Sequence, residues 1–472
     1  MWVPLARPSR RSLIVVAAAL GAVALCVAVL GGFANDAGGV YGDVMRQIIQ
    51  RASLAMLLLI TLPILLVIAA RPPLGLLFLA LLIPHDGLLV IIHPPKFAEG
   101  YKQGLTIYVL IWSIFSVIGK RREKKPLPRY VAPAAFYVAV GLLSAARVGG
   151  LDAAIGLQTS FLYLICIGFS LWLVPFNRKE RDWLVSILML NAFGTSVYGL
   201  YQQVIGQSGL ISMGYEYGRD IRTTGSFLRS FSSFRQPGAF GLFLMVALLV
   251  CVPVALDEWP RVRSKVFLAT TPVILVALAF TFVRSAWLGL AVGSIYLAFK
   301  RYRVLLFFAP FVLPLIVLLP GTFEKGAFSS GSFQQRQSGW AQNLNKAAEP
   351  FGNGIGTTGA AAEKSLKVSA QRAFFYQPDN NYFKVLYELG VFGLFFFIMM
   401  LIACLAYTRE VEERVHGPDR ALVIGVGAMV IGAIVSAFTL VYFEVLPVDW
   451  FFWLMMGTVA SCVLDSSSTP SP

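Results

Sequence analysis

Apolar blocks of roughly 18–25 residues recur along the whole chain, and no other feature constrains its fold as strongly. Each block is long enough to cross a bilayer as a helix. Charged residues make up only 13% of the 472 residues, whereas hydrophobic residues make up 57%. The short alternating segments of a membrane β-barrel are absent. We therefore predict an all-α fold, a polytopic transmembrane helical bundle with about 12–14 spans and one large extracytoplasmic loop.

The first apolar block follows three arginines, and its length favours a transmembrane helix over a cleaved signal peptide. The third is interrupted by "PHD" at 84–86, so it could end near Pro84 and leave an external segment. The candidate spans are 12–33, 51–70, 72–92, 104–119, 130–147, 154–175, 183–205, 238–256, 266–283, 285–299, 304–320, 381–407, 421–442 and 448–464.

Short basic loops set the predicted orientation. With the N-terminus inside, every short basic cluster falls on the inner side, together with more than half of the 39 Lys and Arg. The net charge of +15 then reflects the positive-inside rule rather than nucleic-acid binding. We predict a multi-pass protein of the cytoplasmic (inner) membrane with both termini in the cytoplasm. The predicted inner connections are Arg71, 120–129, 177–182, 261–265, 300–303 and 408–420.

Cysteine and histidine carry little of the predicted chemistry. The five cysteines fall in apolar spans without a CxxC motif, so we interpret them as small core residues. Only three His are present, which argues against a His-built metal site.

Basic residues also occur on the predicted outer side, where the positive-inside rule does not place them. Long loops can cross the membrane despite their charge, so such residues need no function. Arg284 is different, because it lies inside a long apolar run, where a charge costs at least a few kcal/mol. It could snorkel, pair with an acidic side chain or contact a diphosphate. The other outer residues include Arg219, Arg222, Arg229, Arg235, Arg336 and Arg372.

An enzyme on the outer face has no ATP, so it needs an activated substrate such as a lipid-linked sugar diphosphate. Arginines suit the departing diphosphate because they bind phosphate oxygens bidentately and stay charged. An acceptor hydroxyl needs a base, and Asp379 lies at the mouth of the span 381–407. Asp379 could equally be a helix N-cap, or serve as both. Arg336 and Trp340 are one helical turn apart and could line one face.

Two further features of the late segment have alternative interpretations. The glycine run "EPFGNGIGTTG" (349–359) is either a flexible turn or a set of backbone N–H groups that approach an anionic group. Glu388 lies inside an apolar span, and Lys384 is placed to pair with it at i, i+4. We expect Glu388 to bond within the bundle rather than to act in catalysis.

In chain order, "RTTGSF", "TFVRSAWLG", "RQSGW…EPFGNGIGTTG" and "DNNYFKVLYELGVFGL" resemble the O-antigen ligase and Wzy-type polysaccharide polymerase superfamily. The resemblance implies a GT-C-like bundle and metal-independent, cofactor-free glycosyl transfer from an undecaprenyl diphosphate-linked glycan to an acceptor hydroxyl. By motif position, Arg222, Arg284 and Arg336 match the family's external arginines. The ligase branch has a His where this chain reads Asp379-Asn380-Asn381, which favours a polymerase-like member.

From these arguments we predict three parts of the chain: N-terminal transmembrane helices in 1–205, an O-antigen ligase-like core in 206–407 and a C-terminal transmembrane pair in 408–472. The core carries extracytoplasmic loops 206–237 and 321–380. The predicted catalytic residues are Asp379, Arg284 and Arg336. The predicted contacts to diphosphate or glycan are Arg222, Arg235, Arg372, Trp340, Asn380 and Asn381, with no metal ligand.

The leading functional hypothesis is a Wzy-like polymerase that extends a surface or exopolysaccharide. The alternatives are a ligase that moves a finished glycan onto a lipid or protein acceptor, a small-anion transporter and a flippase. Transporters tend to show inverted repeats and broken helices with polar groups at the membrane midplane. This sequence shows no clear half-to-half repeat and its charges cluster outside, which favours an enzyme. Expected partners are the undecaprenyl diphosphate-linked glycan, an acceptor glycan or lipid, and assembly proteins such as a flippase and a chain-length regulator, but no nucleic acid.

Overall fold

The computed structural model describes residues 62–92, 100–118, 125–218, 220–224, 227–305, 350–359, 361–362 and 379–466. It divides the chain into two units, residues 1–71 and 72–472. Residues 62–70 of the first unit are helical, and all contacts below belong to the second unit. Three predicted site residues, Arg336, Trp340 and Arg372, lie outside the described residues, as do the predicted span 12–33 and most of 51–70 and 304–320.

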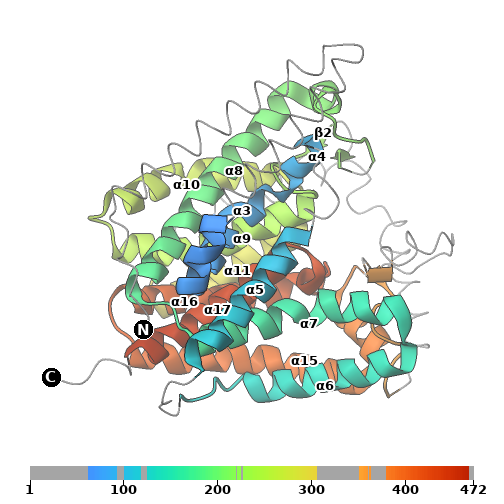
Figure 1. Ribbon diagram of the computed structural model, residues 1–472. Coiled ribbons are helices and arrows are strands. Elements are labelled where there is room, and N and C mark those ends of the chain that lie inside the picture. Colours follow the sequence, from blue (N-terminus) through green and yellow to red (C-terminus); the bar gives the residue numbers. More distant parts are fainter. Residues whose placement is uncertain are drawn as a thin grey trace, which may run out of the picture. The chain divides into compact units, whose positions relative to one another are not determined.

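The second unit is built almost entirely of helices (Figure 1). Nine helical segments of the described chain are long and apolar enough to cross a membrane, so the predicted polytopic helical fold is confirmed and the chain is a multi-pass membrane protein. The helices are α3 (Pro73–Leu82), η1 (Ile83–Leu88), α4 (Leu89–Ile92), α5 (Tyr101–Val117), α6 (Val131–Val148), α7 (Gly150–Leu173), α8 (Arg178–Ser212), α9 (Pro237–Asp257), α10 (Val262–Phe280), α11 (Arg284–Lys300), α15 (Asn381–Arg414), α16 (Pro418–Ser436), η4 (Tyr442–Glu444) and α17 (Val448–Ser466).

Local sequence signals fix several helix ends. A capping box starts α8, because the Asn177 side chain accepts from Glu180 N and the Glu180 side chain accepts from Asn177 N, both at 2.9 Å. Two glycines with positive φ break long helices, Gly206 (φ 66°) in α8 and Gly390 (φ 69°) in α15. The first break falls next to the predicted end of the span 183–205.

The interruption expected near Pro84 is also present. The α-helix α3 ends at Leu82 and the 3₁₀ helix η1 carries the chain past it. Gly87 N donates to Ser233 O, and Ser233 Oγ donates to Pro84 O, both at 2.8 Å. These two hydrogen bonds therefore fix the segment before α9 to the interruption between α3 and α4.

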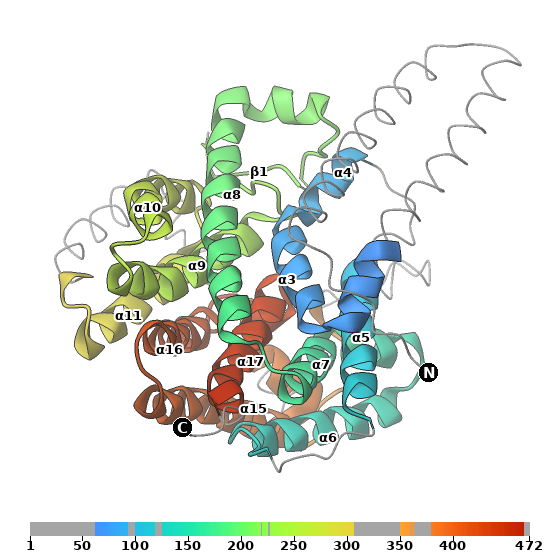
Figure 2. The same ribbon diagram turned by 60° about the vertical axis from the view of Figure 1, so that its left-hand side comes forward.

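The core lies around α9, which is apolar on all sides and almost wholly buried, as expected for a helix surrounded by other helices. It packs against α11 and α16 (Figure 2). Gly289 and Gly293 of α11 lie one turn apart where a side chain would collide with α9 and α16. Small residues of this kind let transmembrane helices approach closely. The outer helices α6 and α10 are only one third buried across their apolar windows.

Ion pairs connect several helices at one end, which we call the ion-pair end. It comprises the starts of α8, α10 and α16 and the ends of α9, α11 and α15. The ion pairs include Arg181–Asp419 at 2.9 Å, Lys300–Glu412 at 2.7 Å and Arg301–Asp257 at 3.2 Å. Four of the predicted inner connections thus meet at one end. The starts of α9, α11 and α15 lie at the opposite end, which we call the hairpin end.

Candidate functional site

A short hairpin holds two arginines opposite each other at the hairpin end. Strand β1 (Arg222–Thr224) pairs antiparallel with β2 (Phe227–Arg229), and Arg222 faces Arg229 in the register. Like charges directly opposite on a hairpin are destabilising, and an isolated hairpin is marginal in any case. The arrangement therefore needs support from the rest of the bundle.

That support comes from α8 and from the turn between α10 and α11. Ser230 N donates to Phe280 O at 2.8 Å, and Arg229 Nε donates to Thr281 O at 3.2 Å. Buried Gln202 of α8 accepts from Ser232 N at 2.8 Å and donates to Ser232 O at 2.9 Å. The residues that follow Arg229 are therefore fixed to two helices.

The same turn places Arg284 as the first residue of α11, with an exposed side chain. Phe282 takes a left-handed conformation (φ 54°), and Thr281 Oγ1 accepts from Val283 N at 3.2 Å. Such a backbone is uncommon for a bulky residue and is often found at functional sites. A helix N-terminus favours anions over cations. An anion bound at Arg284 would therefore interact favourably with both the guanidinium and the helix.

Arginines from the hairpin and from the start of α11 lie near one another, because Arg222 faces Arg229 in the register and Arg229 donates to Thr281 O, three residues before Arg284. Burial lowers the pKa of Arg229 below its ordinary value, and the positive charges of Arg222 and Arg284 lower it further. Arg229 therefore lies between Arg222 and Arg284 and links the two predicted arginines. Arg229 was expected in the outer loop but was not among the predicted site residues, because only the hairpin register sets it opposite Arg222. We call these three residues the arginine cluster.

Arg235 has a different environment at the start of α9. It forms an ion pair with Asp86 at 3.1 Å, and Asp86 also pairs with Lys102 at 2.7 Å. These contacts tie the start of α9 to η1 and α5, so the structure gives Arg235 a role in holding the bundle together.

The start of α15 is fixed by two asparagines. Asn380 Oδ1 accepts from Tyr382 N at 2.8 Å and from Phe383 N at 3.2 Å, so Asn380 is the N-cap and the alternative that Asp379 caps α15 is wrong. Asn381 N donates to Ala437 O at 2.8 Å, and Asn381 Oδ1 accepts from Phe443 N at 3.2 Å. Both asparagines are buried, and half-buried Asp379 precedes them.

The end of α16 joins the start of α15 to the start of α11. Ser436 Oγ donates to Ser285 O at 2.8 Å, while the next residue, Ala437, accepts from Asn381 N. Arg284 directly precedes Ser285, and Asp379 lies two residues before Asn381, so both site residues adjoin these hydrogen bonds. The starts of α11 and α15, which carry Arg284 and follow Asp379, therefore belong to one packed set of helix ends.

The glycine-rich segment lies against the break in α15. A break at Gly390 leaves carbonyl groups before it without helical partners. Asn353 N donates to Tyr387 O at 2.8 Å, and Gly354 N donates to Glu388 O at 3.0 Å. These bonds satisfy the freed carbonyls, so the segment is a specific partner of the break rather than a free turn.

The anionic group that this segment approaches is the chain's own Glu388. Its Oε1 accepts from Thr358 N at 3.1 Å and from Thr358 Oγ1 at 2.7 Å. Its Oε2 pairs with Lys384 Nζ at 2.7 Å, which confirms the predicted i, i+4 pairing, and Lys384 also lies 3.6 Å from Glu444. All three charges are buried, and burial raises the pKa of Glu444 while Lys384 opposes the rise.

Elsewhere the described cysteines, Cys166, Cys251, Cys404 and Cys462, are free and buried, as expected for core residues. Within the same described ranges, no group of three or more His, Cys, Asp or Glu could hold a metal ion.

Comparison with known protein families gives one match. Residues 269–398 match a family model described as O-antigen ligase, and no curated protein matches the chain. The matched stretch runs from α10 into α15 and contains Arg284, Asp379 and the glycine-rich segment. It therefore supports the resemblance that these motifs indicate, whereas Arg222 and Arg229 lie before it.

Proposed function

We propose that this chain belongs to the O-antigen ligase-like superfamily and is a glycosyltransferase that polymerises undecaprenyl diphosphate-linked repeat units on the extracytoplasmic face of the cytoplasmic membrane. The observation that carries the proposal is the arginine cluster, in which Arg222 and Arg229 of the hairpin lie near Arg284 at the start of α11. Mutually repelling guanidinium groups are stabilised by a multivalent anion, and a lipid diphosphate is such an anion.

In the proposed reaction, an acceptor hydroxyl attacks the anomeric carbon of the glycan and forms the new glycosidic bond. The bond from that carbon to the diphosphate oxygen breaks, and undecaprenyl diphosphate leaves with the bonding electron pair. Negative charge on the diphosphate grows as the bond breaks, so arginines held in place beforehand stabilise the transition state more than the ground state. The hydroxyl proton passes to a base.

We assign Asp379 as that base. It lies at the same packed helix ends as Arg284, and Asn380, not Asp379, is the N-cap of α15. A carboxylate can take the proton of an acceptor hydroxyl within hydrogen-bond reach. Arg336 is proposed to assist the transfer, and Arg235, Arg372, Trp340, Asn380 and Asn381 to border the glycan.

A polymerase is favoured over a ligase because Asp379 stands where the ligase branch has a His. The alternative is transfer of a finished glycan to a lipid or protein acceptor, and the second alternative is a small-anion transporter. The test is reconstitution of the purified full chain in liposomes with one lipid-linked repeat unit as both donor and acceptor. Longer lipid-linked glycans and free undecaprenyl diphosphate would support the polymerase, whereas products formed only after addition of a lipid or protein acceptor would indicate a ligase. An unchanged substrate in both conditions would contradict the proposal.

Asp379→Asn should stop turnover and leave binding of the lipid diphosphate intact, because the amide cannot accept the proton but adds no charge near the arginines. We expect a rate lower by about 10²- to 10⁴-fold, the usual contribution of a positioned base. Product formation and substrate affinity are measured on the same preparation. Wild-type turnover would remove Asp379 from the reaction, and Asn380→Ala serves as a comparison that removes the cap and keeps the carboxylate.

The proposed orientation is tested with one cysteine at each end of the helices. Phe227 of the hairpin and His416 before α16 are both exposed. Phe227→Cys should react with a membrane-impermeant maleimide in cells whose inner membrane is intact, and His416→Cys only after lysis. The wild-type chain gives the background from its own cysteines. The reverse pattern would place the arginine cluster in the cytoplasm and contradict the proposed site of reaction.

A further inference from the structure

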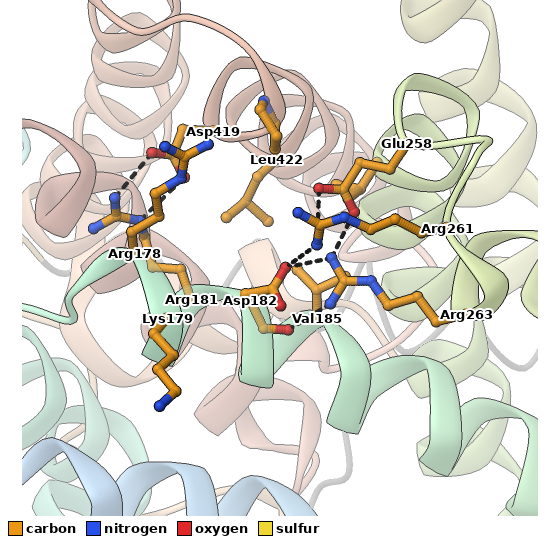
Figure 3. Close-up of a pocket in the computed structure, with 12 residues that line it drawn as sticks. Arg178, Lys179, Arg181, Asp182, Val185, Glu258, Arg261, Arg263, Asp419 and Leu422 are labelled. Atoms are coloured by element: carbon orange, nitrogen blue, oxygen red, sulfur yellow. Dashed lines mark hydrogen bonds and ion pairs between the residues drawn. The ribbon is translucent and has the colours of Figure 1, made fainter.

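A charged cavity lies at the ion-pair end, away from the arginine cluster. It has a volume of about 320 Å³ and is lined by the starts of α8, α10 and α16 and the end of α9 (Figure 3). In Figure 3, Leu422 lies between the Asp419 side and the Glu258 side of the cavity. Neither the family match nor the proposed reaction uses this cavity.

Positive charge is in excess in the lining. The basic side chains are Arg178, Lys179, Arg181, Arg261 and Arg263, against three carboxylates.

The carboxylates are already engaged. Arg181 binds Asp419 through two nitrogens at 3.1 and 2.9 Å, and Arg261 pairs with Asp182 at 2.7 Å. Arg263 bridges Asp182 and Glu258. These ion pairs hold the lining of the cavity in a fixed arrangement. The remaining cations, Arg178 and Lys179, are exposed beside it.

The surrounding backbone adds to the attraction for an anion. The helices α10 and α16 both begin at the cavity, and neither has a side-chain cap for its first N–H groups. Unsatisfied N–H groups and the helix dipole favour a negative charge at such a place. The backbone effect supplements the surplus of basic side chains.

Apolar side chains beside the lining suit a lipid. Trp183 is 41% exposed, Trp259 54% and Val262 76%. Lys179 Nζ lies 5.0 Å from the centroid of the Trp183 ring. Exposed tryptophans beside cations are typical of the level at which lipid headgroups lie. An acyl chain could therefore pass over these side chains while a phosphate occupies the cavity.

We propose that this cavity binds the phosphate of an anionic ligand, and that the ligand is an anionic phospholipid of the surrounding membrane. The cations Arg178 and Lys179 contact the phosphate, and the ion-paired arginines hold the cavity open. A bound phospholipid would link the starts of three helices that lead to the hairpin end.

The experiment is native mass spectrometry of the full chain in detergent, titrated separately with phosphatidylglycerol, phosphatidylcholine and inorganic phosphate. The test variant is Arg178→Gln/Lys179→Gln, which leaves every carboxylate of the cavity with its arginine. The matched control is Lys265→Gln/Arg303→Gln, which removes two exposed cations near the same end but outside the cavity lining.

Wild type and control should bind phosphatidylglycerol, and the test variant should bind it at least about tenfold more weakly, since each of the two lost cations contributes about fivefold in affinity near an anionic headgroup. Binding of inorganic phosphate that is lost in the test variant, without binding of phosphatidylglycerol, would support a phosphate site and overturn its assignment to a lipid. Equal phosphatidylglycerol affinity in the wild type, the test variant and the control would overturn the proposal, as would equal affinity for phosphatidylcholine.

Discussion

Arg284→Ala is expected to lower glycan transfer by at least about 100-fold, because one preorganised donor to a developing negative charge contributes roughly 10²–10³ in rate. Arg284 is exposed at the first position of α11, so its side chain supports little of the packing. The amount of protein in the membrane should therefore stay normal. The measurement is polymer length in cells together with product formation by the reconstituted protein.

Two further variants make the result specific. Arg284→Lys keeps the charge but loses the bidentate hydrogen bonding of the guanidinium, so we expect an intermediate loss of activity. Arg303→Ala removes an exposed arginine after α11, at the ion-pair end, and should leave transfer unchanged. Normal polymer from Arg284→Ala would exclude Arg284 from the reaction.

Lys384→Met is expected to destabilise the protein severely, by about 3–5 kcal/mol, because it leaves buried charges without their partner. Lys384 pairs with Glu388 at 2.7 Å and lies 3.6 Å from Glu444, and all three side chains are at most 6% exposed. Glu388 also holds Thr358 of the glycine-rich segment. We expect a lower membrane level and a lower temperature of thermal unfolding in detergent.

The charge explanation for Lys384 has its own controls. Arg414→Met breaks an ion pair with the same i, i+4 spacing, with Glu410 at 2.6 Å, but Arg414 is 55% and Glu410 20% exposed, so the loss should stay within about 1 kcal/mol. Replacement of the whole group, Lys384→Met with Glu388→Gln and Glu444→Gln, should recover much of the stability, because no buried charge remains. A Lys384→Met protein as stable as wild type would show that the charge of Lys384 does not stabilise the fold.

Most helices of the described chain could be predicted because apolar length is a local property of the sequence. Pro237 and Pro418 open α9 and α16, and glycine breaks α8 near the predicted boundary. Two predicted spans, α5 and α11, are confirmed as helices of 17 residues each. Their length is at the lower end of what crosses a bilayer.

The candidate site could be predicted only in part, because it depends on pairings between distant residues. The motif order pointed to Arg222 and Arg284, but the hairpin register that adds Arg229 needs the tertiary structure. Lys384 was expected to pair with Glu388, whereas Glu444 reaches the same lysine from beyond α16. The N-cap of α15 differed by one residue, since Asp379 and Asn380 both suit that position and only the hydrogen bonds distinguish them.

The most direct test of the arginine cluster is the affinity of the purified full chain for undecaprenyl diphosphate. Wild type should bind it, and Arg222→Gln, Arg229→Gln and Arg284→Gln should each bind it about tenfold more weakly or worse, since a charge-assisted contact is worth roughly 1.5–3 kcal/mol. Arg303→Gln should bind it as wild type does. Unchanged affinity in all three cluster variants would show that these guanidinium groups do not hold the diphosphate.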